Sequence, residues 1–118
     1  MDNYEIITNN PTVIANYPEL SRYIEGGVHD IFIAVRDAVH KGALVISHPL
    51  SGSIKPNESP YKSVVISAIS GPLNIKSLNV IEDAISTLAR MPDKKRVYDE
   101  SVLDDFRIID LDLIKSAL

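Results

Sequence analysis

The chain contains no cysteine among its 118 residues. This absence excludes disulfide bonds, thiolate metal sites and cysteine nucleophiles. Proteins of reducing compartments do without disulfides, so the composition favours a cytoplasmic location.

Long apolar runs and basic runs are also missing. No apolar stretch approaches the roughly 20 residues that span a bilayer, and the N-terminus reaches polar residues too early for a signal peptide. The net charge is −4 at pH 7, and the one dense basic stretch, residues 94–96, is flanked by Asp93 and Asp99. A nucleic-acid site needs a basic face that displaces counterions. We therefore expect neither a membrane nor a nucleic acid as partner.

Signatures of cofactor sites and metal sites are absent as well. The sequence has no Walker loop and no G-x-G-x-x-G fingerprint, so no nucleotide site of a known type is predicted. His29 and His40 are eleven residues apart on an expected helix, too distant to share an ion, and His48 has no second ligand at a fixed spacing. We predict no cofactor and no metal.

The hydrophobic pattern predicts a single α/β domain over residues 1–118. Apolar residues recur at helical spacing over residues 28–39, with Gly42 as a left-handed stop, and again over residues 75–90. Four runs have strand character: residues 4–8, 20–25, 43–47 and 63–70. The run at 43–47 is continuously apolar, as in strands buried on both faces of a parallel sheet. This order of elements predicts a three-layer-like domain with a small, mainly parallel sheet flanked by helices.

The C-terminal tail allows two interpretations. Residues 99–106 have a helical pattern, but beyond them Ile109, Leu111 and Leu113 alternate as in a strand. Leu111, Ile114 and Leu118 instead suit a terminal helix. The sequence leaves this choice open.

Polar residues gather in two loops. The first polar loop, residues 8–11, follows the first expected strand, and the second polar loop, residues 47–63, follows the run at 43–47. If these strands are parallel neighbours, both loops meet at one edge of the sheet, where α/β proteins bind ligands. We therefore predict a shared site there.

The second polar loop has the chemistry of an anion site. Its three prolines lower the entropy of ordering the loop, and Gly52 can adopt positive φ. Backbone N–H groups and hydroxyls at residues 51–53 can face a carboxylate or phosphate, with Lys55 and Lys62 as countercharges. The predicted ligand-binding residues are Thr8, Asn9, Asn10, His48, Ser51, Gly52, Ser53, Lys55, Asn57, Glu58, Tyr61 and Lys62.

Three alternatives stay open. The loop can be an Ω-like segment whose side chains satisfy its own backbone. The protein can be a small hydrolase or an acyl- or phosphoryl-handling enzyme in which His48 acts as base for Ser51 or Ser53, although no G-x-S-x-G elbow is present. It can also be a structural interaction module, for which a homodimer is the common outcome. No catalytic residue is assigned.

The two loops also resemble a known family. The motifs "IITNNP", residues 6–11, and "HPLSGSIKPNESPYKS", residues 48–63, resemble the GrdX family, small proteins encoded beside glycine, sarcosine and betaine reductases in amino-acid-fermenting anaerobes. The resemblance implies a cytoplasmic accessory role around reductases that convert glycine-type substrates to acetyl phosphate, with reductase subunits as candidate partners. It assigns no catalytic residue, and its motifs fall on the ligand-binding residues predicted above. We therefore predict a non-catalytic accessory or binding protein that holds a small anionic ligand or a partner at the two loops.

Overall fold

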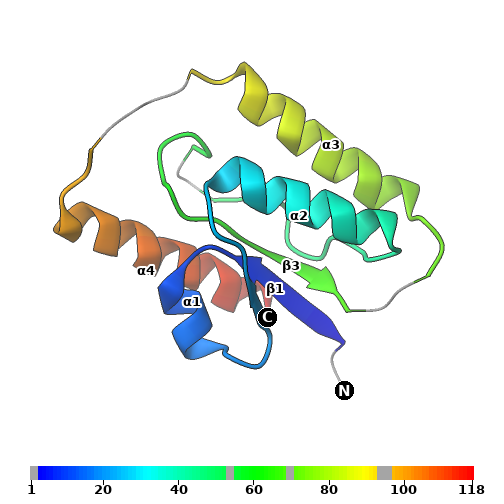
Figure 1. The fold of residues 1–118 in the computed structure, drawn as a ribbon, viewed down its shortest axis with the longest axis horizontal. Helices are drawn as coiled ribbons and strands as arrows, with labels where there is room; N and C mark the ends of the chain where they lie inside the picture. The colour runs from blue at the N-terminus through cyan, green and yellow to red at the C-terminus, as the bar shows by residue number, and fades with distance from the viewer. Residues whose placement is uncertain (1–2, 53–54, 69–70, 93–96) are drawn as a thin grey trace.

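A computed structural model describes residues 3–52, 55–68, 71–92 and 97–118 of the chain. Within these residues the chain forms three strands and four helices (Figure 1). The strands are β1 (Tyr4–Thr8), β2 (Ser21–Tyr23) and β3 (Ser63–Ser67). The helices are α1 (Pro11–Asn16), α2 (Val28–His40), α3 (Ile75–Arg90) and α4 (Glu100–Ala117). The predicted α/β class is confirmed.

The sheet is mixed, so the prediction of a mainly parallel sheet is wrong. Its strand order is β2-β1-β3, with β2 parallel and β3 antiparallel to β1. The prediction rested on the continuously apolar run at residues 43–47. Continuous burial also occurs in the antiparallel strand β3, at all five of its positions. Burial on both faces requires helices on both faces, but it does not fix the direction of a strand.

The apolar run at residues 43–47 is not a strand within the sheet. Only Val45 forms a bridge, to Ile66, and Leu44 and Ile46 are 43% and 49% exposed. The segment instead runs along the outer edge of β3, where the Ile46 N–H donates to the carbonyl of Val65 at 2.9 Å. Unpaired sheet edges invite aggregation, and this segment covers that edge.

Helices cover both faces of the sheet, in three layers (Figure 1). On one face, α2 and α3 pack over Ile7 and Val64, and the core there includes Phe32 and Ile81. On the other face, α1 and α4 pack over Ile6 and Val65. Neighbouring residues of one strand point to opposite faces, so β1 and β3 contribute to both cores.

The two helices predicted from apolar spacing are confirmed. α3 has the predicted bounds, and α2 begins at Val28 as predicted and ends at His40, just before the Gly42 stop. Gly42 follows α2 with a φ of 102°, which confirms the left-handed stop.

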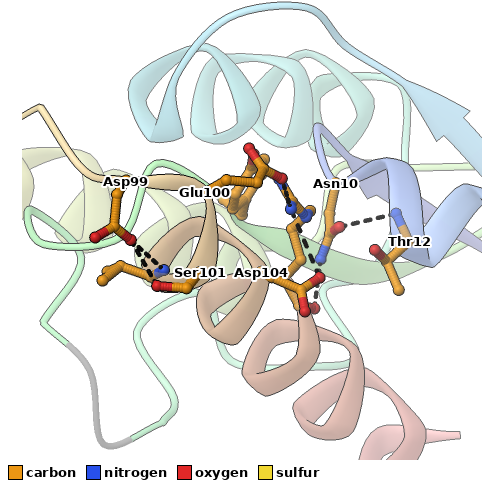
Figure 2. Close-up of polar contacts among 9 residues, drawn as sticks. Asn10, Thr12, Asp99, Glu100, Ser101 and Asp104 are labelled. Atoms are coloured by element: carbon orange, nitrogen blue, oxygen red, sulfur yellow. Dashed lines mark hydrogen bonds and ion pairs between the residues drawn. The ribbon is translucent and has the colours of Figure 1, made fainter.

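The tail forms one continuous helix, α4, so the terminal-helix interpretation is right and the strand interpretation is wrong. The Asp99 carboxylate caps the start of α4 by accepting from the N–H of Val102 at 3.1 Å (Figure 2). Hydrogen bonds from Ser101 and Val102 hold the pKa of Asp99 below its ordinary value. Across the described ranges, no helix has the length and apolarity needed to cross a bilayer.

Candidate functional site

The two polar loops lie side by side, although not for the predicted reason. The antiparallel pairing of β1 and β3 places Thr8, where the first loop begins, opposite Ser63, where the second loop ends. The Asn9 side chain then joins the loops. Its amide donates to the carbonyl of Pro60 at 2.8 Å, and its oxygen accepts from the Lys62 N–H at 2.8 Å. A strand antiparallel to β1, not a parallel neighbour, therefore brings the loops together.

Asn10 connects the first polar loop to two helices. Its side-chain oxygen accepts from the N–H of Thr12 at 3.0 Å and thereby caps α1 (Figure 2). Its amide nitrogen donates to the carbonyl of Arg107 at 2.9 Å and to the carboxylate of Asp110 at 3.0 Å. Asn10 is fully buried. Its amide therefore holds α4 against the start of α1.

Asp110 is the centre of a buried polar network under α4. Its carboxylate accepts from the Ser63 N–H at 3.1 Å and from the Ser63 hydroxyl at 2.7 Å, besides the amide of Asn10. The Thr8 hydroxyl lies 2.6 Å from that of Ser63. Several donors point at one carboxylate, which matches the acceptor-only capacity of an ionised carboxyl group. The network gives Thr8 and Asn10 partners inside the protein, and their predicted contact with a ligand stays a prediction.

A small pocket, with about 30 Å³ of space inside it, lies between the second polar loop and α4. This space has room for a water molecule, so a larger ligand would lie partly outside it. Its polar lining consists of Ser51, Lys55, Ser59, Tyr61, Lys62 and Asp110. Its apolar lining consists of Val28, Pro56, Phe106, Ile109 and Leu113. The pocket thus brings together four of the predicted site residues from the second polar loop.

Lys62 is half-buried at the wall of this pocket. Its ammonium donates to the carbonyl of Ser51 at 3.3 Å. Burial lowers the pKa of Lys62 below its ordinary value, and the charge of Asp110 partly opposes this effect. The pocket therefore contains an amine whose charge is less stabilised than that of a lysine in water.

Tyr61 is held in place by α4. The Arg107 guanidinium donates to the Tyr61 hydroxyl at 2.9 Å and lies 5.5 Å from the centre of its ring. Arg107 also forms an ion pair with Glu100. A second ion pair joins Arg107 to Asp104 at 3.6 Å. These two acidic residues stand at the start of α4 (Figure 2). Glu100 and Asp104 therefore fix Arg107.

His48 and Ser51 do not form the pair that the enzyme alternative requires. The His48 ring accepts at Nδ1 from the N–H of Leu50 at 3.1 Å. The Ser51 hydroxyl donates to the backbone carbonyl of His48, at 2.8 Å, rather than to its ring. These contacts belong to a local turn. Ser53, the other candidate nucleophile, lies outside the described residues.

The remaining candidates have other surroundings. Gly52 has a φ of 113°, and a methyl group at its Cα would lie 2.7 Å from Leu113. The Asn57 amide donates to the carbonyl of Pro92 at 2.9 Å, and the Tyr98 hydroxyl donates to that of Glu58 at 2.9 Å. These last two contacts tie the loop to the segment before α4. Neither Asn57 nor Glu58 lines the pocket.

Sequence reasoning missed the contribution of α4 to the site. Phe106, Ile109, Asp110 and Leu113 all line the pocket. A signal was available, because Phe106, Asp110 and Ile114 recur every four residues and so share one side of a helix. A carboxyl group within an apolar stripe is an informative exception, since unpaired acidic residues are rarely buried.

No group of three or more His, Asp or Glu side chains is arranged to hold a metal ion in the part of the chain that the structure describes. The residues that line the pocket offer two amines, hydroxyls, one carboxylate and an apolar wall.

Comparison with known proteins gives one match. A family model described as GrdX-like protein matches residues 5–118, which include both polar loops and all of α4. No curated protein and no solved structure matches the chain.

Proposed function

We propose that this chain, which belongs to the GrdX-like family, is a non-catalytic accessory protein of glycine, sarcosine and betaine reductase metabolism in the cytoplasm. Its role is to hold a small anionic ligand at the pocket between the second polar loop and α4. The observation that carries this proposal is that two lysines, Lys55 and the half-buried Lys62, line this pocket together.

The charges around the pocket favour an anion. Lys55 and Lys62 contribute two positive charges, against the single carboxylate of Asp110. The carboxylate of Asp110 already accepts hydrogen bonds from Ser63 and Asn10, which offset part of its charge. A bound carboxylate or phosphate would replace the water that Lys62 loses on burial.

Tyr61 adds a hydrogen-bond donor. Its oxygen accepts from Arg107, and a hydroxyl that accepts one hydrogen bond still has its own proton to donate. Because Arg107 fixes the ring, the hydroxyl would bind a ligand at little cost in side-chain entropy.

A thermal-shift screen tests the proposal. We expect at least one of glycine, sarcosine, betaine and acetyl phosphate to stabilise the protein at millimolar concentration, since a ligand that binds only the folded state raises its stability. The Lys62→Met variant should lose this response. The matched Lys115→Met variant, which changes an exposed lysine of α4, should keep it. An unchanged melting temperature with all four compounds would contradict the ligand-binding role.

Co-purification tests the accessory role separately. We expect reductase subunits to be retained by the tagged, full-length chain when both are co-expressed. Retention without a thermal shift would support a partner-binding form of the proposal, in which the two loops contact a protein instead of a small anion. Absence of both results would contradict the proposal as a whole.

A further inference from the structure

We propose that a cleft at the opposite end of the sheet from the two polar loops binds a small α-amino acid in its zwitterionic form. The cleft has about 200 Å³ of space inside it, which is room for several water molecules. Its lining includes two acidic residues, Glu5 and Asp37, and two basic residues, Arg22 and Lys41. This inference goes beyond the proposed function, because it concerns a second site with another ligand chemistry.

Glu5 occupies a position of the central strand at which an apolar side chain is expected. In β1, the middle strand of the sheet, Glu5 pairs in register with Ile66, which belongs to the core under α2. Side chains two positions apart on a strand share a face, so Glu5 points to the same face as Ile7. The small side chains of Ala38 and Ala43 line the cleft there. A charged residue that departs from the apolar pattern of its strand is a feature of functional sites.

Arg22 lies on the same face of the sheet as Glu5. It pairs in register with Ile7, and its Nε lies 3.4 Å from the Oε1 of Glu5. Both side chains remain partly exposed, with 47% for Arg22 and 36% for Glu5. A guanidinium has two further nitrogen atoms, which can bind a carboxylate through a pair of hydrogen bonds. Arg22 can therefore bind the carboxylate of a ligand while Glu5 accepts from its ammonium group.

The end of α2 adds a second charge of each sign. Asp37 and Lys41 are four residues apart, which places them on one side of the helix end. Both are exposed and both line the cleft. A ligand with a single charge would meet repulsion from two of the four charged side chains as well as attraction from the other two. A zwitterion can place each of its charges beside opposite ones, so the charges of the cleft favour it.

The space and the uncharged lining set the size of the ligand. An α-amino acid has both charged groups on one carbon atom, so both can lie within a cleft of about 200 Å³. The uncharged lining includes Ala38, Ala43 and Ile66, which suit a short aliphatic side chain. The cleft therefore favours an amino acid such as alanine over one with a charged or large aromatic side chain.

An NMR titration of the full-length, ¹⁵N-labelled chain tests this inference. The probes are L-alanine, propionate, which lacks the ammonium group, and ethylamine, which lacks the carboxylate. We expect L-alanine at millimolar concentration to shift the backbone signals of Ala38, Ala43 and Ala68 in a saturable manner. It should bind at least about threefold more tightly than either other probe, as expected for one partly exposed ion pair. Absence of saturable shifts with L-alanine, or equal binding of all three probes, would overturn the inference.

Two variants test the charges of the cleft. Glu5→Gln and Lys41→Gln each remove one charge, and each should weaken the binding of L-alanine about threefold. Glu19→Gln and Lys115→Gln change exposed residues outside the lining of the cleft and should leave the affinity unchanged. Because Lys41 is exposed, its variant should fold even if Glu5→Gln does not. Unchanged affinity in Lys41→Gln would contradict a zwitterion site.

The position of the shifts separates this inference from the proposed function. Lys62→Met should keep the response to L-alanine, because Lys62 lines the pocket beside α4 and not the cleft. Shifts at Ser51 and Lys62 instead of the three alanines would place the amino acid at that pocket and overturn the inference.

The thermal-shift screen gives a second separation. Stabilisation by glycine that is lost in Glu5→Gln and kept in Lys62→Met would support the inference, because it would arise from the cleft. Stabilisation by acetyl phosphate without a response to L-alanine would support the proposed function and overturn the inference.

Discussion

The first and second polar loops lie side by side, but their side chains are placed differently. Asn9 and Asn10 of the first loop are 5% and 0% exposed, and each bonds to atoms of other segments. In the second loop, Ser51 and Lys55 are exposed and Lys62 is half-buried, and all three line the pocket. The side chains of the first loop are buried and bonded within the protein, whereas those of the second loop border a pocket.

Burial accounts for this difference. A buried amide must find hydrogen-bond partners within the protein, because an unmade bond costs about 1–3 kcal/mol. A partly exposed amine can exchange its contacts for water or for a ligand. The comparison therefore predicts that changes in the first loop and its network affect stability, while changes in the pocket affect binding.

Asp110→Ala should have the largest effect on stability. The substitution leaves the Ser63 N–H, the Ser63 hydroxyl and the amide of Asn10 without their acceptor. We expect the free energy of unfolding to fall by roughly 3 kcal/mol or more, measured by urea denaturation. Asp110→Asn, which keeps an acceptor oxygen, should lose less. The control, Asp112→Ala on the exposed side of α4, should stay within about 0.5 kcal/mol of wild type. A loss at Asp110 as small as that of the control would contradict the buried network.

Asn9→Ala should have the next largest effect. It removes the amide that joins the carbonyls of Gly26 and Pro60 and leaves the Lys62 N–H without its acceptor. We expect a loss of roughly 2 kcal/mol in the same assay. Asn16→Ala is the matched control, since the Asn16 amide makes one exposed hydrogen bond, to Thr12. Equal losses in the two variants would show that Asn9 does not hold the loops together.

Lys62→Met should have the smallest effect on stability, and one that depends on pH. The pKa of Lys62 in the folded chain is below its ordinary value of 10.5. Between the lowered pKa of the folded chain and 10.5, Lys62 binds more protons in the unfolded chain than in the folded chain. The free energy of unfolding therefore rises with pH in this range. The variant lacks this rise, and its stability relative to wild type should decrease toward about pH 10.5. Lys115→Met should follow the wild-type curve. Parallel curves for wild type and Lys62→Met would contradict the burial of the amine.

Much of the fold could be predicted from the sequence. The spacing of Val28, Ile31, Phe32 and Val35 defines α2, and Gly42 marks its end, because these signals are local. The direction of β3 could not be predicted, since its apolar run reports burial and not which neighbour it pairs with. The prediction of a strand at residues 43–47 was wrong for a related reason: its apolar composition does not show how much of the run pairs with a neighbour, and only Val45 forms a bridge.

The site was predictable only in part. The polar composition of residues 47–63 indicated the loop that lines the pocket, with Ser51, Lys55, Tyr61 and Lys62. The sequence could not show that Asn9 and Asn10 point inward. An asparagine that binds a ligand and an asparagine that binds the protein backbone look the same in a sequence. Asp110 was missed because its partners, Asn10 and Ser63, are far away along the chain.

An NMR titration tests the central claim most directly, namely that the second polar loop is open to a ligand and the first is closed. Acetyl phosphate, or whichever of the four compounds stabilises the protein, would be added to the ¹⁵N-labelled chain. The account predicts that the backbone signals of Ser51, Lys55 and Lys62 shift in a saturable manner, while the side-chain amide signals of Asn9 and Asn10 keep their positions. Saturable shifts of the two asparagine amides, with Lys62 unchanged, would contradict it.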